Sequence, residues 1–353
     1  MAQVTIPKEK TGVDGLFEYQ QDRSEKVRAN IKRFYIYVVL LLIVLVFSML
    51  KLDQVEFFER GHFLSPDSII NLLRSAVPIL IVSGPFTLLM ISEHIDLSVG
   101  SAMSLSAVIF AWMILNGFGF LPALAITLVA GIVMGTLNGY LVMKLRITPV
   151  IATLVTLSLF KGTALLIVPF GSSAIKSTAE QTMPGWINNF ARQEVLLGLP
   201  MAFYVAVFVI IMLIIIQNKT LLGKYAAAIG GNRTAAELSG INVVLVVWIL
   251  YIIVGLYAAL AGVARASYMS LGDPLSGDGM ELACIIAVLL GGTAFSGGEG
   301  SVAKTTVGAI IIMCVTIGLM TVIPAYWQTL ATGSVLLVAV ALNHLLVREK
   351  VPA

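Results

Sequence analysis

The stretch of sequence that decides the fold covers residues 243–268 and reads VVLVVWILYIIVGLYAALAGVARASY, with Arg265 as its one charged residue. It exceeds the roughly 20 apolar residues that an α-helix needs to cross the hydrocarbon core of a bilayer. Its apolar residues are continuous and do not alternate with polar ones, which favours a helix over a barrel strand. We therefore expect the chain to cross a membrane here.

The composition extends this expectation to the whole chain. Of the 353 residues, 58% are hydrophobic and 12% are charged, and the mean hydropathy is +0.97. Soluble domains have about a quarter charged residues, so the sequence predicts an all-α integral membrane protein of about ten transmembrane helices. The expected spans are residues 34–50, 69–91, 98–115, 121–142, 149–168, 199–216, 243–268, 281–291, 305–322 and 327–347.

Two of these spans are expected to be irregular. Pro78 and the pair Gly84-Pro85 predict a kinked or unwound helix over residues 69–91. The stretch 281–291 is too short to cross alone and is expected to be a half-helix that breaks at Gly291-Gly292. Irregular backbone at membrane depth is tolerated only within protein or against a cavity, so both breaks are expected beside a translocation path.

The distribution of basic residues predicts the orientation. With the N-terminus inside, fifteen Lys and Arg residues fall on the inner side and only Lys51, Arg60, Lys176 and Arg192 fall outside. This is the bias expected of a cytoplasmic N-terminus. An even number of spans then places the extension 1–33, the tail 348–353 and the polar segment 217–242 in the cytoplasm, around a single membrane domain over residues 34–347.

The polar segment 217–242 separates two strongly apolar halves of the chain. Its sequence Ala-Ala-Glu-Leu at residues 235–238 favours a short helix, which Gly230-Gly231 and Gly240 punctuate on either side. A short helix on the basic side of a membrane protein is suited to docking on a soluble partner.

Small and charged residues within the spans carry further expectations. Gly131, Gly135 and Gly139 form a doubled G-x-x-x-G pattern, which allows close helix packing, more readily within one subunit than between two. Arg74 and Lys161 are expected to snorkel or to pair with carboxylates. Arg265, near Asp273, Asp278 and Glu281 in the sequence, predicts a salt-bridged outer gate.

The turn 93–96 contains ionisable residues between two spans. A helix-start role for Asp96 or Ser98 is favoured over direct contact with a solute. His94 has no second His or Cys nearby, so no metal site is expected. Residues 298–305 imitate a P-loop, but that motif requires a strand before it in a soluble α/β domain. We therefore expect neither catalysis nor a cofactor in this chain.

Several stretches, taken together and in order, resemble one family. They are residues 95–101, 151–155, 222–225, 229–232, 235–243 and 281–293, with Ser296, Gly297, Gly298 and Gly300. They are similar to the permease subunits of ribose-type ATP-binding-cassette (ABC) importers, which carry monosaccharides and autoinducer-2, and the similarity runs from about residue 63 to 345. The sequence departs from the family pattern at Glu93-His94 and at Ala283-Cys284, which favours a solute outside the ribose set or pairing with a second permease.

The resemblance implies a type II importer-like permease fold in the bacterial inner membrane. It also implies a cytoplasmic ATPase, an extracytoplasmic solute-binding protein, and a second permease copy in a homodimer or a paralogous heterodimer. No nucleic acid partner is expected, and the cargo is expected to be a small polar solute such as a sugar. An ion-coupled secondary carrier and a membrane scaffold remain the alternatives.

Two groups of residues are expected to serve this function. The residues expected to couple the chain to the ATPase are Gly230, Gly231, Asn232, Ala236, Glu237 and Gly240. The residues expected along the translocation path are Pro85, Asp96, Ser98, Thr153, Gly291, Gly292 and Thr293.

Overall fold

The computed structural model describes residues 35–49, 63–170, 172–178 and 181–322, with five isolated helical positions between 327 and 337. The predicted extension 1–33, most of the predicted span 327–347 and the tail 348–353 lie outside the described residues.

The described chain is almost entirely helical. A helix over Tyr35–Met49 comes first. The helices that follow are α2 (Pro66–Ile91), α3 (Val99–Leu115), α4 (Phe120–Met143), α5 (Pro149–Ile167), α6 (Met201–Lys219), α7 (Leu221–Gly231), α8 (Arg233–Leu238), α9 (Val243–Met269), α10 (Met280–Leu290) and α11 (Val302–Val322). A 3-10 turn (Gly185–Asn188) and an antiparallel hairpin of β1 (Glu194–Leu196) and β2 (Leu199–Pro200) lie between α5 and α6. Each of the first nine predicted spans coincides with one of these helices.

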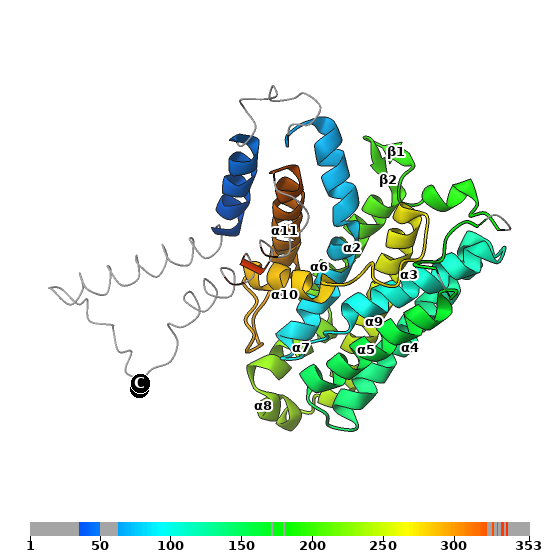
Figure 1. Cartoon of the computed structure of the whole chain (residues 1–353). Helices are drawn as coiled ribbons and strands as arrows, with labels where there is room; N and C mark the ends of the chain where they lie inside the picture. Colours follow the sequence, from blue (N-terminus) through cyan, green and yellow to red (C-terminus); the bar gives the residue numbers. More distant parts are fainter. Residues whose placement is uncertain are drawn as a thin grey trace, which may run out of the picture.

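Six helices in the described part of the chain are long and apolar enough to cross a membrane: α2, α4, α5, α6, α9 and α11. The helices Tyr35–Met49, α3 and α10 are apolar but shorter. Figure 1 shows α7 and α8 at the end of the bundle opposite the β1–β2 hairpin. We call these the α7–α8 end and the hairpin end; the orientation predicted from the basic residues makes the α7–α8 end cytoplasmic.

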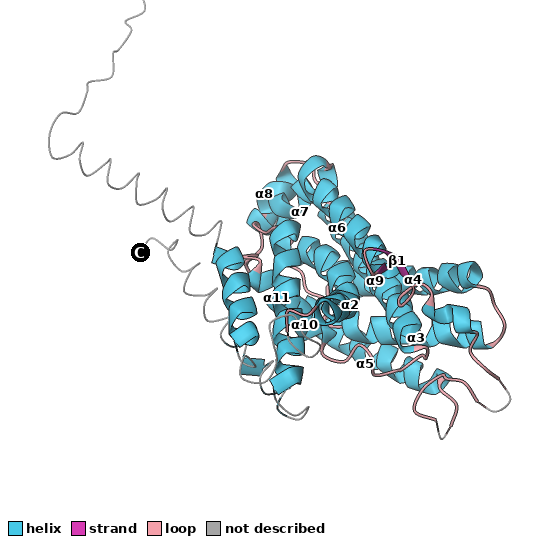
Figure 2. Ribbon diagram, turned by 90° about the horizontal axis from the view of Figure 1, so that it is seen from above, coloured by secondary structure: helices cyan, strands magenta, loops and turns pink. Residues whose placement is uncertain are grey.

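Helix α2 runs through the centre of the bundle. In Figure 2 it lies between α10 and α11 on one side and α3, α5 and α9 on the other, and its residues from Ala76 to Ile91 are all buried. The helix is continuous through Pro78 and Pro85, so of the two predicted forms the unwound one is wrong, and the kinked one stays a prediction. Each proline removes only one backbone donor, and the packing of neighbouring helices around α2 holds its remaining turns in place.

The glycine pattern in α4 packs against α9. A Cβ added at Gly131 or at Gly135 would overlap the backbone of α9, at Gly255 and at Tyr251 respectively. Gly139 lies against the side chain of Trp248 in the same way. The prediction that this pattern serves packing within one subunit is confirmed, since the glycines let the two backbones approach closely.

Helix α10 ends where the sequence predicts. Its last residue is Leu290, Gly291 is the C-cap, and Gly292 follows with a φ of 81°. That φ is accessible to glycine at little cost, so the chain turns sharply here and returns to begin α11 at Val302.

Candidate functional site

The polar segment 217–242 forms two helices where the sequence predicts one. Helix α8 includes the predicted stretch 235–238, but α7 precedes it and continues through Gly230 to Gly231. Gly230 and Gly231 precede α8 as predicted, but they are the last two residues of α7, and the break between the two helices falls at Asn232. The missed signal is the recurrence of Gly223, Ala226 and Ile229, which are buried on one face of α7, at a helical spacing.

Gly230 is the point at which α7 approaches the end of α2 and the segment after α10 most closely. A Cβ at this position would overlap the carbonyl oxygen of Ile91, at the end of α2, and the backbone nitrogen of Gly298. Gly298 N itself donates a hydrogen bond of 2.8 Å to that carbonyl oxygen. The glycines of the polar segment and those that follow α10 thus meet in one contact. In contrast, a Cβ at Gly231 would have no atom within 4 Å.

Helix α8 is displayed at the surface of this end. Its N-cap Asn232 accepts a hydrogen bond from Ala235 N at 2.9 Å, and Arg233 pairs with Glu237 at 3.1 Å. Ala236 is the one buried residue in α8, while the Leu238 side chain is 86% exposed. Gly240, with a φ of 83°, turns the chain toward α9. Helix α8 is therefore accessible to a partner, and Leu238 is its most exposed apolar side chain.

Gln217, near the end of α6, links this helix to the start of α11 at the α7–α8 end. Its amide donates to the Gly300 carbonyl oxygen at 2.8 Å and accepts from Val302 N at 2.9 Å. It therefore supplies a partner to one of the free N–H groups that open α11. Sequence reasoning missed this residue, because its partners lie more than eighty positions away.

A cavity of about 530 Å³ lies beside α8. Arg233 and Glu237 of α8 line it together with His94 and with Arg146, from the turn after α4. Burial lowers the pKa of His94, and the nearby Arg233 lowers it further, against a hydrogen bond of 2.6 Å between Nδ1 and the Ser92 carbonyl oxygen. The imidazole is therefore neutral near pH 7.

Asp96 is the centre of a closed polar cluster. Its Oδ1 accepts hydrogen bonds from Ser98 N at 2.9 Å and from Ser98 Oγ at 2.6 Å. Its Oδ2 accepts from Asn138 Nδ2, on α4, at 3.1 Å. Asp96 is 2% exposed, so these groups take the place of water around the carboxylate.

This geometry corrects the predicted cap. Ser98 is the N-cap of α3 but its side chain forms no capping hydrogen bond, and Asp96 holds the turn before the helix rather than the free N–H groups within it. Asn138 was not identified from the sequence. The available signal was an amide side chain in an otherwise apolar span, which usually forms a hydrogen bond between helices.

The other residues predicted along a path lie apart from this cluster. Pro85 is buried within α2, and Thr153, on α5, donates to its own helix at Pro149 O, at 2.8 Å. Gly291 packs against Thr305 of α11. Thr293 is buried, and its Oγ1 has no hydrogen-bond partner among the described residues. None of these residues lines the cavity beside α8, and their place on a translocation path stays a prediction.

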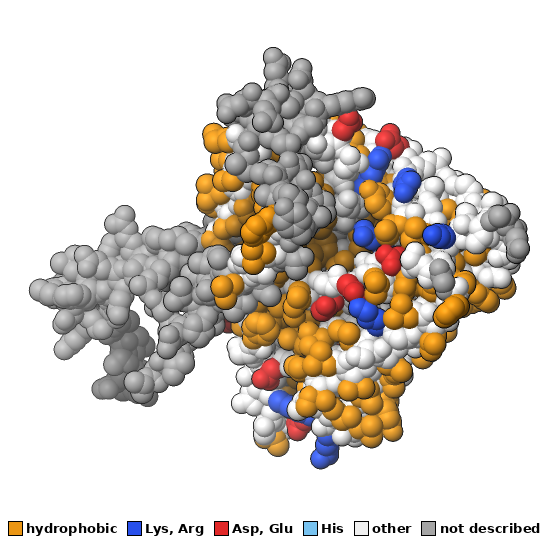
Figure 3. Space-filling view, in the orientation of Figure 1, with side chains coloured by type: hydrophobic (Ala, Val, Ile, Leu, Met, Phe, Trp, Pro, Cys, Tyr) orange, Lys and Arg blue, Asp and Glu red, His pale blue; other side chains and the backbone are white. Residues whose placement is uncertain are grey.

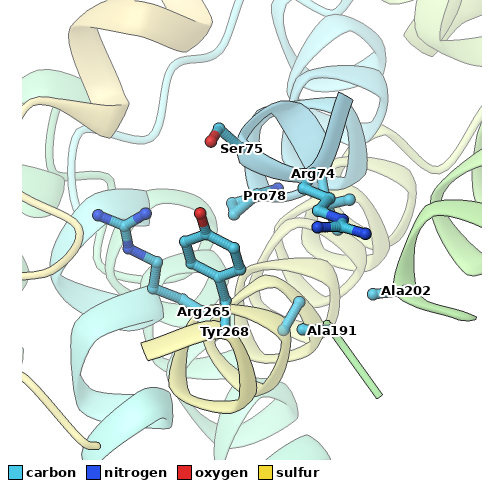
Figure 4. A pocket seen from close by; sticks show the side chains of 9 residues that line it. Arg74, Ser75, Pro78, Ala191, Ala202, Arg265 and Tyr268 are labelled. Atoms are coloured by element: carbon cyan, nitrogen blue, oxygen red, sulfur yellow. The ribbon is translucent and has the colours of Figure 1, made fainter. Parts of the chain in front are cut away.

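Ion pairs at the hairpin end and on α5 confirm two predictions and correct a third. Arg74 pairs with Glu194 at 2.7 Å, and Lys161 pairs with Asp278 at 2.7 Å. The predicted salt bridge between Arg265 and a nearby carboxylate is absent from the described residues, since Lys161 of α5 takes Asp278 instead. Figure 4 shows the Arg265 side chain directed away from Arg74, with the Tyr268 ring between them.

Comparison with known proteins agrees with this architecture. The family model described as branched-chain amino acid transport system / permease component matches residues 68–340. The ribose import permease protein of Bacillus subtilis is 33% identical over 287 residues, covering 80% of this chain and 86% of the relative. The D-allose transport system permease protein of Escherichia coli is 30% identical over 334 residues, covering 93% and 97%. No solved structure matches the chain.

The family match spans most of the chain, and these relatives are aligned over nearly their whole length. The chain therefore belongs to the transport-system permease family that this model describes, and it resembles the permease subunits of ribose-type ABC importers.

Proposed function

We propose that this chain is the membrane subunit of an ABC importer, which passes a monosaccharide inward across the bacterial inner membrane. The names of the related permeases include ribose, allose, galactose and fructose. In this proposal ATP is hydrolysed by a partner ATPase, a binding protein delivers the solute from outside, and two permease copies enclose the path.

The observation that carries the proposal is the close approach of Gly230 to the backbone of Ile91 and of Gly298. Helix α8 is exposed for contact with a partner, while α7 touches the ends of α2 and of the segment after α10 through a glycine. A force applied to α8 by an ATPase would therefore reach helices in the membrane without passing through flexible side chains. This is the arrangement that a rigid-body switch requires.

The test compares two neighbouring glycines in the complete importer, reconstituted with its ATPase and binding protein. Gly230→Ala is expected to reduce ATP-driven uptake at least tenfold, because the new methyl group must displace Ile91 O or Gly298 N. Gly231→Ala is the matched control and is expected to retain uptake, since its methyl group meets nothing within 4 Å. Both variants should insert in the membrane.

Docking of the ATPase is tested with two exposed leucines. Leu238→Asp, on α8, is expected to lose the ATPase during purification, whereas Leu197→Asp, in the hairpin, is expected to keep it; the two side chains are 86% and 83% exposed. Equal retention of the ATPase by both variants would contradict the proposed docking surface. Uptake by the permease alone under an ion gradient would instead indicate a secondary carrier.

A further inference from the structure

A cavity of about 280 Å³ lies between four helices in the hairpin-end half of the bundle. It is distinct from the residues proposed for coupling and from the Asp96 cluster. Its lining includes Ile79, Arg265, Ser276, Asp278, Met280 and Met313. They come from α2, α9, the segment before α10, α10 itself and α11.

Two polar atoms of the cavity lining have no partner among the described residues. These are Nε of Arg265 and Oγ of Ser276, and both atoms are buried. A buried polar group left without a hydrogen bond destabilises the folded protein. Such groups are normally satisfied by protein or water. The two residues that carry them line the same cavity, so a solute there can supply the missing partners once these side chains turn toward it.

The chemistry of the lining matches a polyhydroxylated ring. Arg265 supplies donors, the Asp278 carboxylate supplies acceptors, and the Ser276 hydroxyl can do both. Ile79, Met280 and Met313 supply an apolar wall, against which the C–H face of a sugar can pack. The volume is close to the lower limit of about 300 Å³ for small-molecule pockets, which suits one monosaccharide better than an oligosaccharide.

The Tyr268 ring borders the same region. A smaller adjoining cavity, shown in Figure 4, is lined by Tyr268 and shares Ser75, Pro78 and Arg265 with the larger one. The Arg192 guanidinium lies 5.3 Å from the centre of the Tyr268 ring. This contact fixes an aromatic side chain at the edge of the cavity.

The cavity is also adjacent to a face that hydrocarbon cannot cover. Asp278 lines the cavity and pairs with Lys161 of α5, and the two side chains are 48% and 34% exposed. A charged pair this exposed would be costly against lipid tails. Figure 3 shows charged side chains that extend from the hairpin end to the middle of this face. Water or a second protein surface must therefore meet this face.

We propose that the cavity lined by Arg265, Ser276 and Asp278 is a transient monosaccharide-binding site on the path from the hairpin end. The inference rests on the proposed function and extends it by naming the side chains that contact the solute. Arg265 and Asp278 bind the ring hydroxyls, Ser276 orients them, and the apolar wall excludes larger solutes. Because the site is small and partly open, it holds the solute weakly and releases it inward.

The first experiment measures access and protection in the complete importer. The native cysteines Cys284 and Cys314 are both buried and are replaced by serine or alanine. Ser276→Cys is then treated with a charged, membrane-impermeant thiol reagent, without sugar and with increasing concentrations of D-ribose, D-allose, D-galactose or D-fructose. Ser173→Cys, in the exposed segment after α5, is the matched control.

We expect the reagent to modify both cysteines and one of these sugars to slow modification at Ser276→Cys at least fivefold. The same sugar should leave Ser173→Cys unaffected. A Ser276→Cys variant that takes up sugar but is never modified, or is modified equally fast with every sugar, would overturn the proposed site.

The second experiment separates this site from the proposed function. Arg265→Gln is expected to lower ATP-driven uptake of the transported sugar at least tenfold while it keeps the ATPase bound, and Lys176→Gln is expected to change uptake less than threefold. Lys176 is the control, because it is an exposed basic residue in the segment after α5 and lines neither of the two cavities. Normal uptake by Arg265→Gln would overturn the proposed binding site but would leave the proposed function standing. A wild-type importer that takes up none of the four sugars would overturn the proposed function, and the site with it.

Discussion

The Asp96 cluster and the Arg265 cavity are two ways of keeping polar groups inside a membrane protein. Both Asp96 oxygens are occupied by donors from Ser98 and Asn138. Arg265 and Ser276 line a cavity, and the buried Nε and Oγ atoms of these side chains have no partner among the described residues. The sequence presents both as ionisable residues near or within spans, and their surroundings separate them.

The comparison indicates how a structural polar residue differs from one that serves a solute. In the Asp96 cluster the protein supplies a donor to each carboxylate oxygen, so removal of this carboxylate should act on folding. In the Arg265 cavity the protein leaves bonds open, so its removal should act on transport with little effect on folding. Substitutions in and around the two regions should therefore differ in kind and in size.

Asp96→Ala should have the largest effect on stability. It leaves the Ser98 N–H and hydroxyl donors buried without their carboxylate acceptor, at about 1–3 kcal/mol for each group, while Asn138 Nδ2 keeps its hydrogen bond to Ser98 Oγ at 2.8 Å. Asp96→Asn keeps one acceptor oxygen and should have a mild effect. Thermal unfolding of both variants in detergent checks this. An Asp96→Ala variant that folds normally but prefers a different solute would place Asp96 on the translocation path. The Asp96 cluster and the Arg265 cavity would then not differ in the way proposed.

Gly135→Leu should lower stability by about 1–3 kcal/mol or more, because its side chain must enter the backbone of α9 at Tyr251. Gly162→Leu, in α5, meets nothing within 4 Å and should leave the thermal midpoint of a single subunit nearly unchanged. Unfolding midpoints measure the difference. If Gly162→Leu disrupts association of two copies without unfolding either, the α5 face beside Lys161 is a subunit contact.

Lys161→Gln should cost less than about 1 kcal/mol if its pair with Asp278 is in contact with water. Should the pair be sealed from water, loss of one partner would cost about 3–5 kcal/mol instead. A chemical-denaturation curve distinguishes the two values. A large loss of stability would show that this ion pair is enclosed by protein, as the Asp96 carboxylate is.

The smallest effect concerns His94. Burial lowers the pKa of His94 in the folded protein, so the neutral ring contributes stability that is full above the unfolded pKa of 6.5 and is lost as pH falls through the folded pKa. The thermal midpoint should therefore decrease on acidification below pH 6.5, and this decrease should be smaller in His94→Gln. An identical pH dependence in the two proteins would show that another group titrates.

Much of the fold could be predicted from the sequence, because apolar periodicity and length are local properties. The helix ends near Gly291, and the packing of Gly131 and Gly135, follow from residues read in order. The continuity of α2 could not be predicted, since neighbouring helices compensate for Pro78 and Pro85. Helix α7 was missed because its polar surroundings concealed a short buried face.

The candidate site was less accessible to sequence reasoning, because its contacts join distant segments. Gly230 lies in the polar segment 217–242 and Gly298 in the glycine-rich stretch after α10, but nothing in the sequence indicates that they touch. Asp278 lies closer to Arg265 in sequence than to Lys161, yet it pairs with Lys161. Which charged residues pair depends on how the helices pack, and proximity in the sequence does not reveal this.

The most direct test of this account is sugar uptake by Arg265→Gln and Asp96→Asn, measured side by side in the reconstituted importer with ATP. We expect Asp96→Asn to retain most of the wild-type uptake rate, and Arg265→Gln to lose at least tenfold although it keeps the ATPase and the wild-type thermal midpoint. Normal uptake by Arg265→Gln together with failed uptake by a well-folded Asp96→Asn would contradict the account.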